Sequence, residues 1–334
     1  MGYLVLGLAA TGVASAGLNA APVRTSRTGR FSPAAGDTRP APTPDTLRNH
    51  DRSEVQRKLD RFVANFNPIP VDSRPQSALP TVNESRECLP FTAQMLSSIV
   101  RWRQGADLQA QADAPMTQDF SLKFGVKEQA RMLDALIDKS PTLQQALQEA
   151  KRKKIRIAWN DYSSWLPESK AIHLSRQLKL KPKDVIANPQ AVFASVLYLF
   201  GDLSHELCHS TRREINATPS AHHTFADFEE AHLGHIARSE ALAVFGELNI
   251  AQELFEATGV IVPVATANYR CGTPQSIFHS NDLSTDEKID SLADFLRLKH
   301  PAFQSTYKEE AIALWAAAVS GKGRRRGAGG SDEL

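Results

Sequence analysis

The sequence predicts a mainly helical α+β fold with a small sheet. Apolar residues recur at helical spacing through most of the body, and two short segments after residue 154 alternate between apolar and polar residues, as strands do. Hydrophobic residues make up 42% of the chain and charged residues 23%, as in globular proteins. This composition excludes a mainly disordered chain and a protein with many membrane spans.

The charge balance limits the class of partner. Lys and Arg total 39 against 37 Asp and Glu, which gives a formal net charge of +2. This surplus is too small for a generally polycationic nucleic-acid binder, so we expect no nucleic-acid partner. Three cysteines are too few for a disulfide scaffold, and the odd number leaves at least one free thiol. Cys88 and Cys271 could form a disulfide if the protein is exported, whereas Cys208 is expected to be a packed thiol.

The N-terminal segment resembles an export signal. Residues 1–21 carry no charged side chain, and the apolar part from Tyr3 to Leu18 has the length of a signal-peptide core, with small residues for a cleavage site. The missing basic residues leave an uncleaved apolar N-terminus or a misassigned start as alternatives. Export would place the protein outside the cell or in the periplasm, or deliver it to a host cell, rather than leave it in the cytoplasm. No stable membrane span is expected after cleavage.

Composition divides the remaining chain into four parts. Residues 22–50 are rich in Pro, Thr, Ser, Arg and Ala and are predicted to be a disordered linker. Residues 51–153 are predicted to form a helical extension, and residues 154–320 the main domain. The Gly- and Arg-rich residues 321–334 are predicted to be a disordered tail.

The elements follow from the local patterns. Val55, Leu59 and Phe62 begin an apolar stripe that predicts a helix from Ser53. Alternation predicts strands that form a hairpin or lie side by side, and longer periodic runs predict helices. The expected strands are 155–159, 170–174 and 260–264; the other expected helices are 89–102, 126–140, 142–153, 191–214, 225–257, one from 284 or 285, and 305–319.

The motif that carries chemistry lies in the helix predicted over residues 191–214. His205-Glu206-Leu207-Cys208-His209 has the pattern H-E-x-x-H. Residues four apart share one face of a helix, so both imidazoles can reach one metal ion. Glu206 lies one step round the helix, where its carboxylate can take a proton from a water molecule. Two solvent-facing histidines on an exposed helix edge are the alternative.

On this motif and its context, residues 154–257 resemble the zincin metallopeptidases. The resemblance implies one zinc ion, a peptide or protein substrate, and a sheet above the metal-binding helix. It also implies an edge strand at Ala171–Leu174 that binds extended substrate by strand addition. Arg212 and Ile215 stand where the metzincin subclass needs Gly and His, so that subclass is excluded.

The gluzincin subclass takes its third zinc ligand from a Glu on the following helix, and Glu240 fits that place. The small Ala241 and Ala243 beside it allow two helices to approach closely. Glu247, two turns further along the same face, could be a group that supports a ligand. The remaining rivals are Glu229, Glu230, His232 and His235.

For the other candidate residues, no sequence motif indicates a role. Tyr269 and His279 follow the second long helix, where some zincins place a group that stabilises the transition state. Asp202, three residues before His205, is either a supporting group or a surface charge.

The expected function is therefore a zinc-dependent endopeptidase, a hydrolase in which Glu206 acts as general base and His205, His209 and Glu240 hold the metal. Two alternatives remain at this stage. One is a secreted helical effector that binds a partner protein and has a non-catalytic H-E-x-x-H. The other is a zinc hydrolase that acts on a non-peptide substrate.

Overall fold

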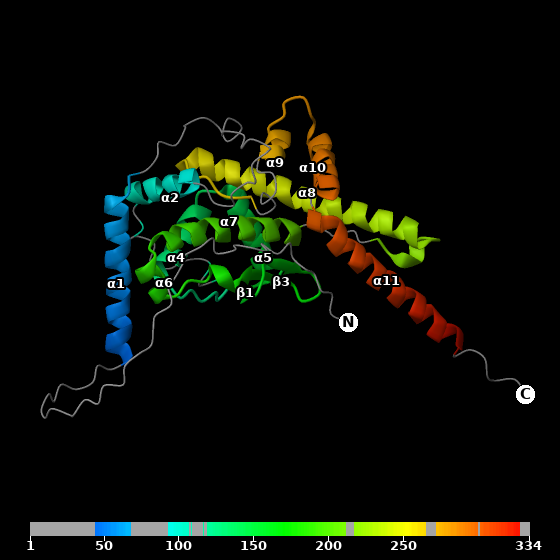
Figure 1. Cartoon of the computed structure of the whole chain (residues 1–334), viewed down its shortest axis with the longest axis horizontal. Coiled ribbons are helices and arrows are strands. Elements are labelled where there is room, and N and C mark those ends of the chain that lie inside the picture. Colours follow the sequence, from blue (N-terminus) through cyan, green and yellow to red (C-terminus); the bar gives the residue numbers. More distant parts are fainter. Residues whose placement is uncertain are drawn as a thin grey trace, which may run out of the picture.

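The computed structural model describes residues 44–67, 93–106, 108, 116, 119–211, 217–264, 272–299 and 301–327. It confirms the predicted fold class, because the described chain is mainly helical with one three-stranded sheet (Figure 1). The expectations for the export segment and for Cys88, Tyr269 and Cys271 lie outside the described residues.

The described helices and strands follow one another in this order: α1 (Pro44–Asn65), α2 (Ala93–Gly105), α4 (Lys127–Ile137), α5 (Pro141–Arg152), β1 (Arg156–Asn160), β2 (Ser164–Leu166), β3 (Ala171–Ser175), η2 (Arg176–Leu178), α6 (Pro182–Ala187), α7 (Gln190–Ser210), η3 (Pro219–Ala221), α8 (Phe225–Thr258), α9 (Gly272–Phe278), α10 (Thr285–Lys299) and α11 (Pro301–Gly327).

Helix α7 lies at the centre of the molecule and contacts α2, α4, α5, α8 and the sheet. It is the one described helix that is long and apolar enough to span a membrane, but most of its apolar stretch is buried within the fold. Its buried hydroxyls are satisfied locally: Ser195 Oγ donates to the carbonyl of Val192 and Ser204 Oγ to that of Phe200. The helix that carries the motif is thus a core element.

The sheet differs from the prediction in one respect that matters for the site. Its strand order is β1-β3-β2, with β1 parallel and β2 antiparallel to β3. The predicted strands 155–159 and 170–174 do lie side by side, but the connection between them contains β2. Because β3 is paired on both sides, the expectation that Ala171–Leu174 forms a substrate-binding edge is wrong. The two edge strands of this sheet are β1 and β2.

The segment 260–264 was expected to be a strand, and it is an extended buried segment without ladder pairing. Pro263 in its middle has no backbone N–H to donate to a neighbouring strand. The segment crosses α7 at Gly201, where an added Cβ would lie 2.7 Å from the carbonyl oxygen of Pro263. A glycine in the middle of α7 is therefore explained by this close backbone approach.

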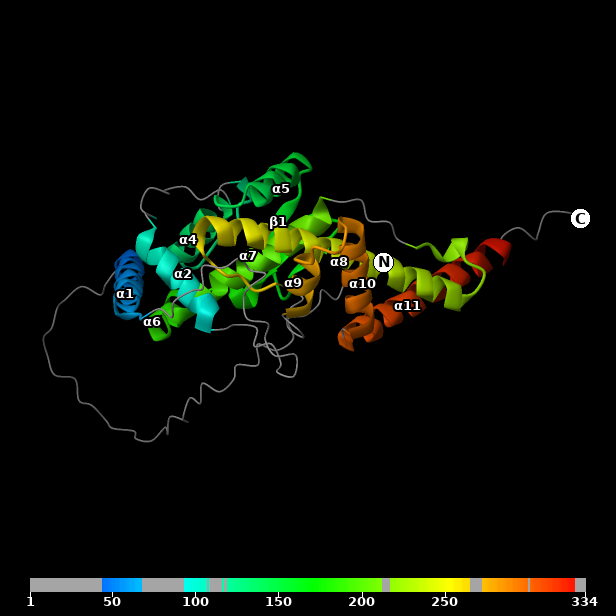
Figure 2. The ribbon, with the colours of Figure 1, turned by 90° about the horizontal axis from the view of Figure 1, so that it is seen from above.

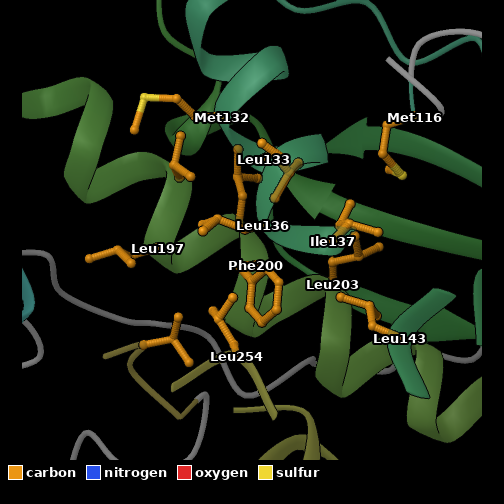
Figure 3. Close-up of a cluster of buried hydrophobic side chains, with 14 of the residues drawn as sticks. Met116, Met132, Leu133, Leu136, Ile137, Leu143, Leu197, Phe200, Leu203 and Leu254 are labelled. Atoms are coloured by element: carbon orange, nitrogen blue, oxygen red, sulfur yellow. The ribbon is translucent and has the colours of Figure 1, made fainter. Parts of the chain in front are cut away.

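Two hydrophobic clusters make up most of the core. The larger cluster joins α1, α2, α4 and α5 with α7, β1, β3 and the C-terminal half of α8. Figure 3 shows part of it, with Leu133 and Leu136 of α4 facing Phe200 and Leu203 of α7. The described helices of residues 51–153 thus contribute to the same cluster as α7.

The second cluster joins the middle of α8 with α9, α10 and α11. Helix α8 matches the predicted helix 225–257 to within one residue. Thr224 caps its first turn by accepting a hydrogen bond from the N–H of Asp227, and Gly259 ends it with a φ of 71°. Its N-terminal part lies beside α11, which projects away from the body (Figures 1 and 2).

Two of the predicted boundaries between ordered and disordered segments lie inside helices. Helix α1 begins at Pro44, inside the segment predicted as linker, and α11 continues to Gly327, inside the predicted tail. Proline is tolerated in the first turn of a helix, so its presence alone did not exclude this start. The short helices α6 and α9 were not predicted, because six or seven residues give too little periodicity to detect.

Candidate metal centre

The crossing of α7 and α8 brings three predicted ligands together. The Nε2 atoms of His205 and His209 are 3.1 Å apart. Oε2 of Glu240 lies 3.3 Å from the first of these nitrogens and 3.5 Å from the second. The three residues form the one group suited to a metal ion that the described part of the chain contains.

The three atoms have the spacing that a tetrahedral zinc site requires. Ligand bonds of about 2.0–2.1 Å at tetrahedral angles place neighbouring ligand atoms about 3.3 Å apart. Oε2 of Glu240 is buried and accepts no hydrogen bond, although a buried carboxylate oxygen normally has a partner. A cation held by this oxygen and the two imidazoles would satisfy it, so the residues fit a zinc ion.

The second nitrogen of each histidine also has a partner. Nδ1 of His205 lies 3.2 Å from Oε2 of Glu247, and Nδ1 of His209 lies 3.4 Å from the hydroxyl of Ser239. Such contacts fix the ring orientation and leave Nε2 free for a metal. The contact of Glu247 with His205 agrees with the supporting role expected for it.

Charges within the site reinforce this arrangement. Burial disfavours a charged His205, but the carboxylates of Glu240 and Glu247 outweigh burial and raise its pKa well above the usual value. Burial opposes the charge of Glu240 as well, yet the two histidines hold its pKa far below its usual range. Glu240 is therefore ionised, as a carboxylate that binds a metal ion must be.

Glu206 differs from Glu240 although both are buried acids. Its exposed fraction is 8%, and burial raises its pKa to about 7, against the smaller lowering effect of His205 and His209. A carboxylate with this pKa is a stronger base than an exposed one and can still release its proton near neutral pH. Glu206 thus has the protonation behaviour of a general base.

Asp202 is a supporting group and not a surface charge. It accepts a hydrogen bond from Ser163, which precedes β2, and Ser163 Oγ also accepts one from the N–H of Ser175. Burial raises the pKa of Asp202 to about 6, although its hydrogen bond to Ser163 opposes this rise. The contact ties the start of β2 to α7 one turn before His205.

The rival ligands on α8 have other partners. Glu229 pairs with Lys308 at 2.9 Å and Glu230 with Arg297 at 2.6 Å. His232 is buried and stacks on Phe228. None of these three residues belongs to the described metal-binding group.

Two other sequence candidates, His279 and Cys208, are not part of the described metal-binding group. His279 follows α9 and packs its ring against Phe278, and no described hydrogen bond or ion pair joins it to the three ligands. Its role as a stabiliser stays a prediction. Cys208 is buried in the larger hydrophobic cluster, which agrees with the packed thiol expected there.

Two residues of the site, Ser239 and Tyr307, were missed by sequence reasoning. The hydroxyl of Tyr307, on α11, donates a 3.2 Å hydrogen bond to Oε1 of Glu240. Burial and the charge of Glu240 raise the pKa of Tyr307 well above its usual value, so the hydroxyl keeps its proton. Tyr307 is 67 residues beyond Glu240 in a helix without a motif, and no sequence signal connects the two.

Comparison of the chain with family models, with curated protein sequences and with solved structures found no match. The functional argument therefore depends on the geometry of the site itself.

Proposed function

We propose that this protein is a zinc-dependent peptidase. The observation that carries the proposal is the convergence of His205, His209 and Glu240 beside the buried Glu206. Two imidazoles and one carboxylate are the donor set of many catalytic zinc sites, which keep a fourth position open for water or substrate.

Each residue has a distinct task in this proposal. When bound, a zinc ion supplies a Lewis acid that polarises a carbonyl oxygen and lowers the pKa of a coordinated water to about 7. Glu206 takes a proton from the water as its oxygen attacks the peptide carbonyl carbon. The same carboxyl returns the proton to the nitrogen as the C–N bond breaks. Glu247 and Ser239 hold the two imidazole rings in place.

The sheet supports a peptide as substrate, with β2 in place of β3 as the strand that pairs with it. Strand β3 has no free edge, whereas β2 is an edge strand that contacts α7. Ser163 at the start of β2 is hydrogen-bonded to Asp202 on the metal-binding helix. An extended peptide that pairs with the outer edge of β2 would run beside this helix, and main-chain hydrogen bonds would hold it without demanding one side-chain sequence.

Replacement of the general base tests the mechanism. We expect Glu206→Gln to reduce cleavage of a peptide library by about 10²- to 10⁴-fold, since Gln cannot accept the proton. Zinc content, measured by mass spectrometry of the purified full chain, should remain at one ion per molecule. Glu256→Gln is the matched control, because Glu256 is exposed near the far end of α8 and accepts a hydrogen bond from Gln252 of the same helix.

The same experiment separates the alternatives. Full activity of Glu206→Gln would contradict the mechanism. A wild-type chain with zinc that cleaves no peptide would favour a hydrolase of another substrate. A chain that binds no zinc would favour a binding protein with a non-catalytic motif.

A further inference from the structure

A hydrogen bond across the interface of α8 and α11 reaches the candidate metal centre. Tyr307 is 7% exposed, and its hydroxyl donates to Oε1 of Glu240 at 3.2 Å. The other oxygen of the same carboxylate, Oε2, is the one that faces His205 and His209. The two oxygens thus have separate partners, one on α11 and one pair on α7.

The ring of Tyr307 is held firmly where this contact is made. It packs against Phe303, one turn earlier, with ring centroids 4.7 Å apart, and both belong to the second hydrophobic cluster. Lys308 of α11 pairs with Glu229 of α8 at 2.9 Å, and Glu310 lies 4.0 Å from Nε2 of His232. Apolar packing at Phe303 and the ion pair of Lys308 therefore hold α11 on α8 on both sides of the hydroxyl.

The geometry constrains the rotation of the Glu240 carboxylate. A carboxylate on a flexible side chain can turn either oxygen, or both, toward a cation. A hydrogen bond to Oε1 holds one oxygen away from the metal position and leaves Oε2 directed at the imidazoles. Partners of this kind, which fix a metal ligand without touching the metal, commonly change metal affinity by about 10- to 100-fold when they are removed.

We propose that Tyr307 is a positioning residue of the metal centre, and that the C-terminal helix α11 is therefore part of the site. The proposal rests on the zinc site described above and adds to it. Tyr307 acts through Glu240 and is not a catalytic residue in this scheme. If instead the hydroxyl contacts Glu240 only to satisfy its own hydrogen-bonding need, its removal leaves metal binding unchanged.

The test is Tyr307→Phe in the full chain, which keeps the buried ring and removes only the hydroxyl. We expect Zn²⁺ affinity, measured by competition with a chromophoric chelator, to fall about tenfold. With Co²⁺ in place of Zn²⁺, we expect the visible absorption bands to shift, since they report the ligand geometry around the ion. Both readouts use the metal alone and need no substrate.

Phe303→Leu is the matched control on the same helix. It loosens the packing of the Tyr307 ring but leaves the hydroxyl in place, so we expect a lower melting temperature with a Zn²⁺ affinity within about twofold of the wild type. Unchanged Zn²⁺ affinity and Co²⁺ spectrum in Tyr307→Phe would overturn the inference while leaving the zinc site intact. Equal losses of affinity in both variants would overturn it too, because packing alone would then explain the effect. A wild-type chain that binds neither ion would overturn the proposed function itself.

Discussion

Helices α7 and α11 both bring side chains to the candidate metal centre, but neighbouring elements cover α7 on several sides and α11 on one face. Helix α7 is enclosed by helices on several sides and by the sheet. Helix α11 packs through one face on α8 and α10, while Ile312 and Val319 remain 48% and 55% exposed. The enclosed helix supplies His205 and His209, and the helix with one packed face supplies only the hydroxyl of Tyr307. The two histidines of the candidate site thus lie on the more fully enclosed of these two helices.

The largest expected effect is the loss of zinc binding when a proposed ligand on α7 or α8 is removed. His205→Ala and Glu240→Ala should each abolish stoichiometric zinc binding, because two remaining ligands cannot hold the ion. Zinc content after dialysis is the measurement, with Glu256→Ala as the control on α8. Stoichiometric zinc in Glu240→Ala would move the third ligand to another residue.

Core substitutions compare the packing of the two helices directly. Phe200 of α7 is fully buried, and we expect Phe200→Ala to lower the free energy of unfolding by about 3–5 kcal/mol through lost contacts and a cavity. Ile312→Ala on the exposed face of α11 should change it by about 0.5 kcal/mol or less. Urea denaturation measures both, and similar losses would show that α11 is buried by contacts beyond those of the described chain.

Asp134, a buried acid on α4 beside α7, makes the stability of the fold depend on pH. Asp134 of α4 accepts a hydrogen bond from the N–H of Met116, but burial dominates and raises its pKa from 3.8 to about 7. Between about pH 4 and pH 7 the folded state therefore binds a proton that the unfolded state releases. As the pH rises through this range, the free energy of unfolding falls by about 1.4 kcal/mol for each pH unit.

Asp134→Asn should remove this part of the pH dependence, leaving the parts from other buried groups. Unfolding of the metal-free chain in urea at pH 4.5, 5.5 and 6.5 would show it as a smaller slope for the variant than for the wild type. Parallel slopes would show that Asp134 titrates alike in both states.

The smallest expected changes in the free energy of unfolding come from replacing two glycines within helices by alanine. In Gly201→Ala, the new methyl group would meet the carbonyl oxygen of Pro263 at 2.7 Å, so the extended segment over α7 must shift. We expect a loss of about 1–3 kcal/mol in the free energy of unfolding. Gly234 of α8 has open space around its Cβ position, and Gly234→Ala should add up to about 1 kcal/mol through helix propensity. A gain in both variants would show that the close approach at Gly201 carries no cost.

Part of this molecule could be predicted because the relevant signals are local. The spacing of His205 and His209 on a helix depends only on helical geometry, and the bounds of α8 follow from a threonine cap and a terminal glycine. Glu240 was a candidate because the resemblance to gluzincins implies a third ligand on the helix after the motif, and small residues stand beside Glu240. For each of these residues, the neighbours in sequence carry the physical information.

Other features could not be predicted because they depend on contacts between distant segments. Strand β2 has three residues, too few for a pattern, and its pairing with β3 removes the edge that Ala171–Leu174 was expected to offer. The segment 260–264 has strand-like composition, but its path over Gly201 leaves it without a partner strand.

The sequence by itself determined the helical fold class, the motif on α7 and the candidate ligands, since periodicity, caps and residue spacing act over a few turns of chain. Only the tertiary structure decided that Glu240 faces the two histidines, that Glu247 and Ser239 hold their rings, and that Tyr307 reaches the site from α11. The reason is physical. A site of a few ångströms is set by how whole helices pack, and that packing depends on the complete set of buried side chains and not on any one segment.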